Sequence, residues 1–199
     1  MPLLACRRVV LGLAAAAAAA LFAGPAFAAD PAQLIQSTAA EVIEIIKTKT
    51  GAARQAAIQQ VLQTKFDLPY MGQAALGVNW NKATEAQRAR FLKAAETAEA
   101  RAYSERFGQY GGQTLNIGKV IKRPNGVVWV DSRLTQTSGE PIKIEWEVRD
   151  VGHGLRITDV KVEGVSMVMT RRSDFNSYIQ NNGGTVEPLI NELEARAAR

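Results

Sequence analysis

The single histidine is the first residue whose type could support catalysis. His153 lies between Gly152 and Gly154, in a segment with the composition of a turn. General acid–base catalysis requires a side chain held within hydrogen-bond reach of a second group. The flanking glycines leave this backbone too free to hold an imidazole in one place. We therefore expect His153 to be an exposed turn residue and not a general base.

A serine close to a glycine is the second candidate, as a nucleophile. Ser166 lies in Glu163-Gly164-Val165-Ser166-Met167, which shares one glycine with the Gly-x-Ser-x-Gly elbow of serine hydrolases. The second glycine is absent, and no histidine is placed to activate the hydroxyl group. A small-molecule hydrolase is an alternative reading that requires a polar pocket around His153 or Ser166.

Two carboxylates at alternate positions, Glu145 and Glu147, are the remaining candidates for acid–base chemistry. They alternate with apolar residues, so on an extended strand both point away from the apolar side. Lys143 and Arg149 fall on the same charged side, which predicts cross-strand ion pairs on a wet surface. With one histidine and one cysteine in the whole chain, we expect no metal site, no cofactor and no enzyme.

The N-terminus has the three parts of a secretory signal peptide. Arg7 and Arg8 precede an uncharged apolar run over residues 9–22, which is followed by Ala26-Phe27-Ala28. The run is shorter than the roughly 20 residues that a membrane-spanning helix needs. A positive start, a short apolar middle and a small-residue exit predict a cleaved signal peptide over residues 1–28 and a periplasmic protein. An uncleaved anchor is the alternative.

The composition of the remaining chain excludes several classes of partner. The formal charge of the whole chain is +5, and removal of two leader arginines reduces it to 5 − 2 = +3. This mild, interspersed excess gives no reason to expect nucleic-acid binding. The only cysteine, Cys6, lies in the leader, so we expect stability from an ordinary core without disulfides.

The first half of the chain after the leader has helical periodicity. Asp30 and Pro31 form a favourable helix start, and Asp67 is placed to cap a short third helix. Thr84 and Gln87 form a capping box at the start of the longest helix. We therefore expect four helices between residues 30 and 110.

Gly111-Gly112 marks a change to strand periodicity. Four runs with strand character follow, over residues 115–121, 127–134, 142–149 and 155–162. In the last run the apolar positions change from odd to even numbers, which predicts a β-bulge near Thr158-Asp159. Two C-terminal helices, the first capped by Ser173, end the chain.

This order of elements predicts an α+β fold in a single domain over residues 29–199. The domain has N-terminal helices, a four-stranded antiparallel meander sheet and two C-terminal helices. The third strand is apolar on one side and charged on the other, as in a sheet covered on one face only. The apolar face either packs into a filled core, the commoner outcome, or lines a cavity, and periodicity does not separate the two.

Four short stretches after Phe66 stand out together by their order and spacing. They are Tyr70-Met71 leading to Leu76-Gly77-x-x-Trp80, Ala83-Thr84-x-x-Gln87-Arg88, Tyr110-x-Gly112-Gln113-Thr114 and Glu163-Gly164-Val165-Ser166-Met167. Each stretch is weakly specific alone. As a set behind a predicted leader, they resemble the MlaC family within the broader toluene-tolerance group, and the likeness covers most of the chain after residue 28.

The resemblance implies a periplasmic carrier that holds lipid acyl chains in an apolar cavity between its helices and sheet. Tyr103 matches the family's tyrosine on the long helix, and Ile142 and Ile144 match apolar strand positions beside it. Alternation and position within the motifs add further lipid-binding candidates. These are Trp146, Val130, Met71, Leu76 and Met167.

The resemblance also implies partners and leaves the cargo open. It implies a phospholipid or related membrane lipid as cargo, an inner-membrane ABC-type lipid transporter complex and an outer-membrane lipoprotein complex. Related proteins accompany hopanoid biosynthesis, so a polycyclic lipid is an alternative cargo. The small residues Gly72, Ala74, Ala75 and Gly77 could shape a cavity for either. A non-enzymatic envelope scaffold with a filled core is the second alternative.

Overall fold

The computed structural model of the chain describes residues 30–108 and 110–198. The predicted leader lies outside these residues. The helices are α1 (Pro31–Thr48), α2 (Gly51–Lys65), α3 (Leu68–Leu76), the short 3-10 helix η1 (Gly77–Asn79), α4 (Glu85–Phe107), α5 (Met167–Asn181) and α6 (Glu187–Ala198). The strands are β1 (Thr114–Lys122), β2 (Val128–Thr135), β3 (Ile142–Asp150), β4 (Leu155–Val162) and β5 (Val165–Ser166).

The strands form one antiparallel meander in the order β1-β2-β3-β4-β5. The α+β fold and the meander are confirmed, but the sheet has five strands where the sequence predicts four. The additional strand, β5, is two residues long and pairs with the end of β4. Two residues are too few to show an alternating pattern, so the sequence carries no signal for it.

The predicted bulge is present in β4. Val148 pairs with Ile157 while Glu147 pairs with Asp159, so Thr158 is an extra residue that opposes no residue of β3 in the register, and its hydroxyl donates to Glu147 Oε1 at 2.8 Å. The insertion returns the later apolar residues of β4 to the face of the earlier ones. It therefore gives the sheet one continuous apolar face and one charged face.

Local capping sets the helix starts. Asp30 accepts a hydrogen bond from the Ala32 amide at 2.9 Å, and Thr84 and Gln87 form both bonds of the predicted capping box. The prediction for Ser173 is wrong. The helix α5 begins at Met167, and the Ser166 hydroxyl accepts the Met169 amide at 3.0 Å.

Three apolar cores hold the elements together. The sheet core joins the buried Ile35 of α1 to Val130, Val148 and Ile157. The α1–α2 core contains Ile45, Ile58 and Val61, with Tyr103 and Phe107 of α4 packed against it. The helical core lies among α3, α4, α5 and α6. Its buried members are Ala75, Leu76, Ala83, Phe91, Ala94, Val168, Phe175, Ile179, Val186, Leu189, Ile190 and Leu193.

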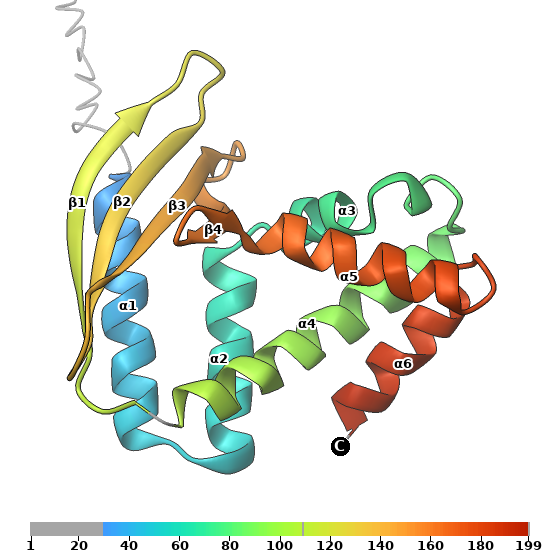
Figure 1. Ribbon diagram of the computed structural model, residues 1–199, viewed down its shortest axis with the longest axis horizontal. Helices are drawn as coiled ribbons and strands as arrows, with labels where there is room; N and C mark the ends of the chain where they lie inside the picture. The colour runs from blue at the N-terminus through green and yellow to red at the C-terminus, as the bar shows by residue number, and fades with distance from the viewer. Residues whose placement is uncertain (1–29, 109, 199) are drawn as a thin grey trace, which may run out of the picture.

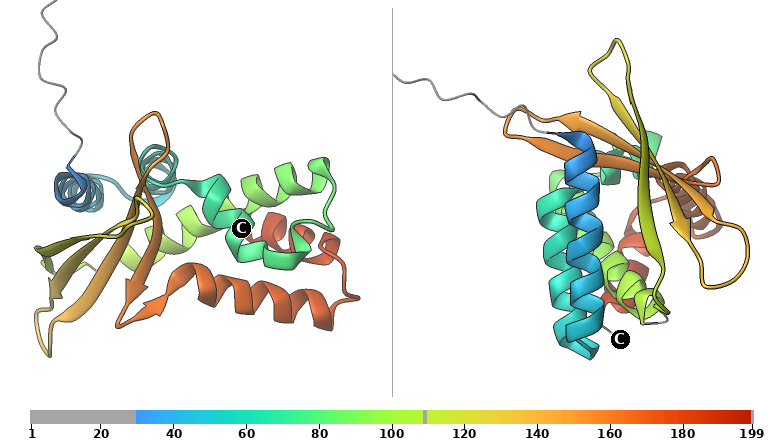
Figure 2. Two further views of the ribbon diagram at one scale, coloured as in Figure 1. Left: turned by 90° about the horizontal axis from the view of Figure 1, so that it is seen from above. Right: turned by 90° about the vertical axis from the view of Figure 1, so that its left-hand side faces the viewer.

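These cores divide the molecule into two unequal parts. The twisted sheet lies at one side with α1 along its apolar face, and α3, α5 and α6 lie at the other side (Figures 1 and 2). The long helix α4 runs diagonally between the two parts, because its first half belongs to the helical core and its last turns belong to the α1–α2 core. Within the described residues, no helix is long and apolar enough to span a bilayer.

Candidate functional site

The apolar face of the sheet is covered only in part. Val130, Val148 and Ile157 are completely buried in the sheet core, to which α1 contributes Ile35 and against which Phe66 packs. Further along the strands toward the β2–β3 turn, the same face carries apolar residues that are only half-buried and belong to none of the three cores. These are Leu134, Ile142, Ile144 and Val162. An apolar face left open in this way is the kind of surface that binds an apolar ligand.

The last turns of α4 supply aromatic side chains to the α1–α2 core. The rings of Tyr103 and Phe107 stack with centroids 5.8 Å apart and an interplanar angle of 24°. Both residues are half-buried. Their packing against Ile58 and Val61 fixes these rings and leaves part of their apolar surface uncovered.

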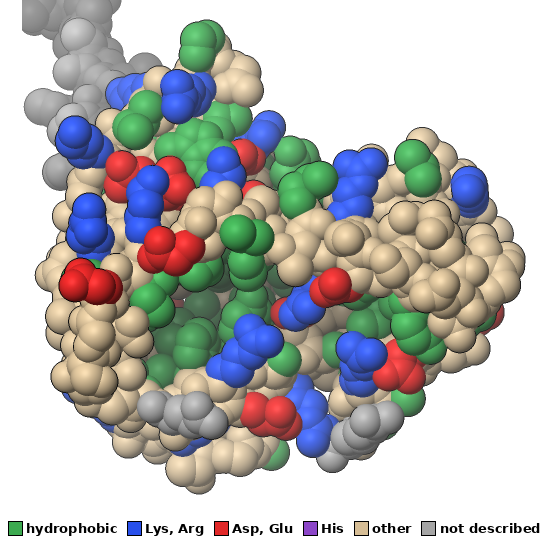
Figure 3. Space-filling model, in the orientation of Figure 1, with side chains coloured by type: hydrophobic (Ala, Val, Ile, Leu, Met, Phe, Trp, Pro, Cys, Tyr) green, Lys and Arg blue, Asp and Glu red, His purple; other side chains and the backbone are tan. Residues whose placement is uncertain are grey.

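A recess lies between the sheet and these helices. Figure 3 shows it as a hollow bounded by the sheet, the β4–α5 junction and α4, with hydrophobic side chains in its depth. Its position follows from the chain path in Figure 1, since α4 leads toward the uncovered end of the sheet and α2 lies behind. The recess is concave and apolar, as small-molecule sites commonly are.

Charged groups stand beside the Tyr103 hydroxyl. Burial raises the pKa of Tyr103 above its ordinary value, and the negative charge of Glu99 adds to this rise, while Arg171 and Arg106 oppose it. Arg171 of α5 donates to both Glu99 carboxylate oxygens, at 2.5 and 3.1 Å. Burial, the largest single influence, lowers the pKa of Arg171, but the hydrogen bonds and negative charge of Glu99, together with Tyr103 and Asp174, raise it overall. This bidentate pair ties α5 to α4 next to the aromatic side of the recess.

Trp146 is held in place by a hydrogen bond within the sheet. Its indole N–H donates to the Ser132 hydroxyl at 2.9 Å, and that hydroxyl donates to the Ile144 carbonyl at 3.0 Å. The polar atom of the indole is therefore satisfied, so the ring presents its apolar surface to the sheet core.

The structure separates the sequence-predicted lipid-binding residues into groups. Ile142, Ile144 and Trp146 share the apolar face, and Tyr103 lies on α4. Val130 is on the same face but is completely buried, so it supports the wall and has no free surface. Met71 and Leu76 belong to the helical core, away from the sheet face. Met167 is the half-buried first residue of α5.

The small residues of α3 and Gly77 of η1 serve helix packing. A Cβ atom on Gly72 would lie 2.4 Å from the Leu92 side chain, and one on Gly77 would lie 2.6 Å from Arg172 Nε. Gly77 also has φ +57°, which favours glycine. On α4, Ala94 is likewise buried in the helical core, and Ala95 and Ala98 pack against it. These residues permit close approach and give no reason to distinguish one cargo from another.

Two other pockets in the described residues lie outside the recess. One, of about 270 Å³, is bounded by η1 and α5 and lined by Leu76, Val78 and Met169 with polar neighbours. The other, of about 420 Å³, lies between the start of α2, α4 and the end of α6 and contains Arg101 and Glu105. Both are open and partly polar, so neither matches the apolar site that the sequence predicts.

The residues considered for catalysis are exposed or make structural contacts. His153 is exposed in the β3–β4 turn, as predicted, and Ser166 caps α5. Glu145 and Glu147 pair with Lys143 at 3.1 Å and Arg149 at 2.7 Å. These ion pairs run along β3 and not across strands, because residues two apart on a strand share a face. Across residues 30–108 and 110–198, no cluster of His, Cys, Asp and Glu is arranged to hold a metal ion.

Sequence reasoning missed several residues beside the recess. Leu134 and Val162 follow the same alternation as Ile144 and could have been assigned from register. The Glu99–Arg171 pair joins residues 72 positions apart. No periodic signal links such residues, so only the folded chain brings this pair to Tyr103.

The fold and the recess define an α+β protein whose one-sided sheet leaves an apolar hollow next to a long helix. The MlaC protein family model matches residues 36–195, and the chain belongs to this family. A phospholipid-binding protein from Ralstonia solanacearum, solved in complex with a phospholipid, has the same fold with a TM-score of 0.73. It is 20% identical in sequence, and the match covers 85% of this chain and 98% of that one.

Proposed function

We propose that this protein is a periplasmic lipid carrier that holds acyl chains in the recess between its sheet and α4. One observation carries the proposal: four apolar residues of the sheet face, Leu134, Ile142, Ile144 and Val162, are left half-buried and join none of the three cores. The phospholipid bound by the Ralstonia protein of the same fold supports a phospholipid as cargo.

The energetics suit a carrier that exchanges lipid with membranes. Each buried methylene contributes about 0.8 kcal/mol, so two long acyl chains gain roughly 20 kcal/mol relative to water. A bilayer offers similar burial, so the net preference between membrane and protein is small. Lipid therefore enters and leaves without an energy source in the protein itself, and a partner that spends energy sets the direction.

The residues beside the recess have distinct roles in this proposal. Ile142 and Ile144 contact acyl chains, Trp146 forms the end wall and Tyr103 faces the chains from α4. Arg171, held by Glu99, is our candidate for contact with the lipid headgroup. The protein's partners are an inner-membrane ABC-type lipid transporter complex and an outer-membrane lipoprotein complex, between which it shuttles lipid as a non-enzymatic carrier.

Uptake of labelled phospholipid from vesicles tests this proposal. An Ile144→Glu variant places a charge against the acyl chains, so we expect at least about tenfold less lipid per protein. Arg133→Glu is the matched control, because Arg133 is exposed on the charged face of β2 and makes no salt bridge within the described residues. It should take up lipid as the wild type does.

Circular dichroism and thermal unfolding show whether both variants fold. The proposal fails if the wild-type protein takes up no lipid. It also fails if a folded Ile144→Glu variant takes up as much lipid as Arg133→Glu.

A further inference from the structure

The hairpin that joins β1 to β2 ends in an exposed tip, residues 119–126. Every residue of this tip is exposed, including two large apolar side chains, Val120 at 42% and Ile121 at 36%. Figures 1 and 2 show the hairpin extending beyond α1 and the rest of the sheet. The tip is therefore a projection whose apolar residues no other described element covers.

Both faces of the tip carry an apolar and a cationic side chain. Val120 lies opposite Val130 and Lys122 opposite Val128, which places both on the apolar face of the sheet. Ile121 lies opposite Trp129 on the charged face, and Arg123 follows it there by alternation. Each face thus carries an apolar and a cationic side chain, and Lys119 adds a third cation to the tip.

The cations of the tip lack partners in the protein. Lys119, Lys122 and Arg123 form no salt bridge within the described residues. Residues 117–130 contain no Asp or Glu. Elsewhere on the sheet, Lys143 and Arg149 are paired with glutamates. The tip therefore carries three uncompensated positive charges.

The backbone of the turn satisfies itself. The Arg123 amide donates to the Val127 carbonyl at 2.8 Å, and the Gly126 amide donates to the Arg123 carbonyl at 3.2 Å. The Val127 amide donates to Asn125 Oδ1 at 3.3 Å. A turn whose amides are paired in this way enters a poorly hydrated environment at low cost.

We propose that the hairpin tip docks this protein on an anionic lipid bilayer. Val120 and Ile121 enter the headgroup region, and Lys119, Lys122 and Arg123 pair with lipid phosphates around them. A bilayer fits better than a protein partner, because the tip is convex, carries an apolar and a cationic side chain on each face and offers no groove. This inference rests on the proposed carrier function and names the surface that would hold the carrier at a bilayer.

Flotation with vesicles measures docking directly. Protein purified without detergent from cells expressing the full chain is mixed with vesicles of 30% anionic phosphatidylglycerol in phosphatidylcholine, or with phosphatidylcholine alone. Each Lys or Arg near an anionic leaflet strengthens binding roughly fivefold, so Lys122→Glu/Arg123→Glu should weaken binding at least about 25-fold. Val120→Ser/Ile121→Ser should weaken it by roughly tenfold. Binding to phosphatidylcholine alone should be weak.

Two matched controls separate the tip from general surface properties. Lys47→Glu/Lys49→Glu makes the same charge change on exposed residues at the other end of α1. Val78→Ser/Met169→Ser removes the same kind of exposed apolar surface from η1 and α5. Both controls should bind vesicles nearly as the wild type does.

The outcomes distinguish this inference from the carrier proposal. Equal weakening of vesicle binding in the tip variants and in their controls overturns the inference, because general surface properties then explain binding. Wild-type binding by the tip variants overturns the inference as well. The cations would then serve only to keep the exposed edge strand β1 from pairing with other chains. Failure of lipid uptake with docking intact contradicts the carrier proposal and leaves the docking surface standing.

Discussion

Tyr103 connects the chemistry of the recess with the stability of the fold. Its ring stacks on Phe107 and packs against α2, while its hydroxyl lies near Glu99 and Arg171. Burial and the nearby carboxylate both disfavour a phenolate at this position. The neutral hydroxyl therefore persists to higher pH in the folded chain than in the unfolded chain.

The raised pKa of Tyr103 predicts a specific alkaline loss of stability. Its contribution is fully present below the ordinary value of 10.0 and is lost as the pH rises through that value toward the folded-state pKa. Tyr103→Phe removes this contribution, so its free energy of unfolding should fall less between pH 9 and pH 11 than that of the wild type. Urea unfolding at each pH measures the difference, and parallel profiles would refute the assignment.

At the scale of single elements, short-range patterns account for most starts and ends. The caps of α1 and α4 and the bulge of β4 depend on residues within four positions of one another, so the sequence predicts them. The start of α5 depends on a turn instead. Glu163 and Gly164 both have positive φ, and this turn carries the chain from β4 through β5 directly into the helix.

Replacement of the α5 cap should separate the two serines that could fill it. Ser166→Ala removes the hydrogen bond to the Met169 amide and should lower the free energy of unfolding by about 1 kcal/mol. Ser173→Ala is the control, because Ser173 is exposed within α5, and it should change stability by less than about 0.5 kcal/mol. Chemical denaturation of both variants measures this. Equal losses would show that the cap contributes nothing specific.

From the sequence, the candidate site can be predicted only as far as which face of each strand a residue occupies. Alternation places Ile142, Ile144 and Trp146 on one side of β3, and the register confirms this. It does not say that α1 covers Val130 completely while Ile144 remains half-buried, because that depends on how far α1 reaches along the sheet. The motif residues Met71 and Leu76 are apolar because they pack in the helical core. Local pattern does not distinguish core packing from lipid binding.

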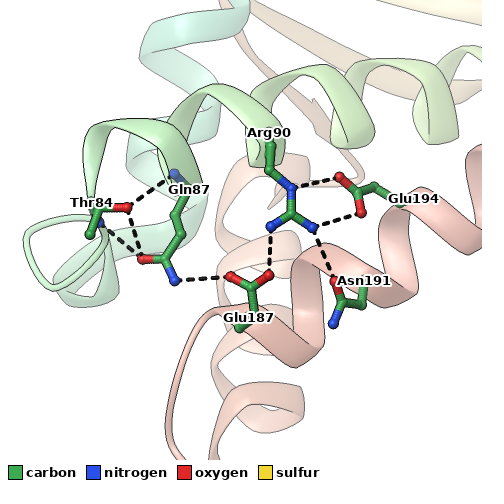
Figure 4. Close-up of polar contacts among 6 residues, drawn as sticks. All are labelled: Thr84, Gln87, Arg90, Glu187, Asn191 and Glu194. Carbon is green, nitrogen blue, oxygen red and sulfur yellow. Dashed lines mark hydrogen bonds and ion pairs between the residues drawn. The ribbon is translucent and has the colours of Figure 1, made fainter.

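At the scale of the molecule, α4 carries the connection between the sheet side and the helical side. A polar network fixes α6 to its exposed surface, as Figure 4 shows. Arg90 donates to Glu187 at 2.5 Å and to Glu194 at 2.8 and 3.0 Å, and Gln87 donates to Glu187 at 2.9 Å. This network fixes α6 on α4, two of the helices that enclose the helical core.

The Arg90 network should make stability depend on pH in the acid range. The Gln87 and Arg90 hydrogen bonds lower the pKa of Glu187, and the Arg90 hydrogen bond lowers that of Glu194, both from 4.5. Their contribution is present above pH 4.5 and is lost as the pH falls below that value. Arg90→Met should therefore be less stable than the wild type at pH 7, with a difference that narrows toward pH 3.

Lys93→Met is the control for the Arg90 variant. Lys93 is exposed on α4 and forms no salt bridge within the described residues. Its stability should follow the wild-type curve across the acid range. An Arg90→Met curve that stays parallel to the wild-type curve from pH 7 to pH 3 would contradict the role given to the network.

The central claim is that the recess holds a membrane lipid, and lipid mass spectrometry tests it most directly. The protein is purified from its native envelope without detergent, and the extracted lipid is quantified against protein. We predict stoichiometric phospholipid that is lost in the Ile144→Glu variant and kept in Arg133→Glu; a polycyclic lipid in its place would keep the carrier mechanism with a different cargo. Protein that carries no lipid and takes none from vesicles would contradict the account and favour an envelope scaffold.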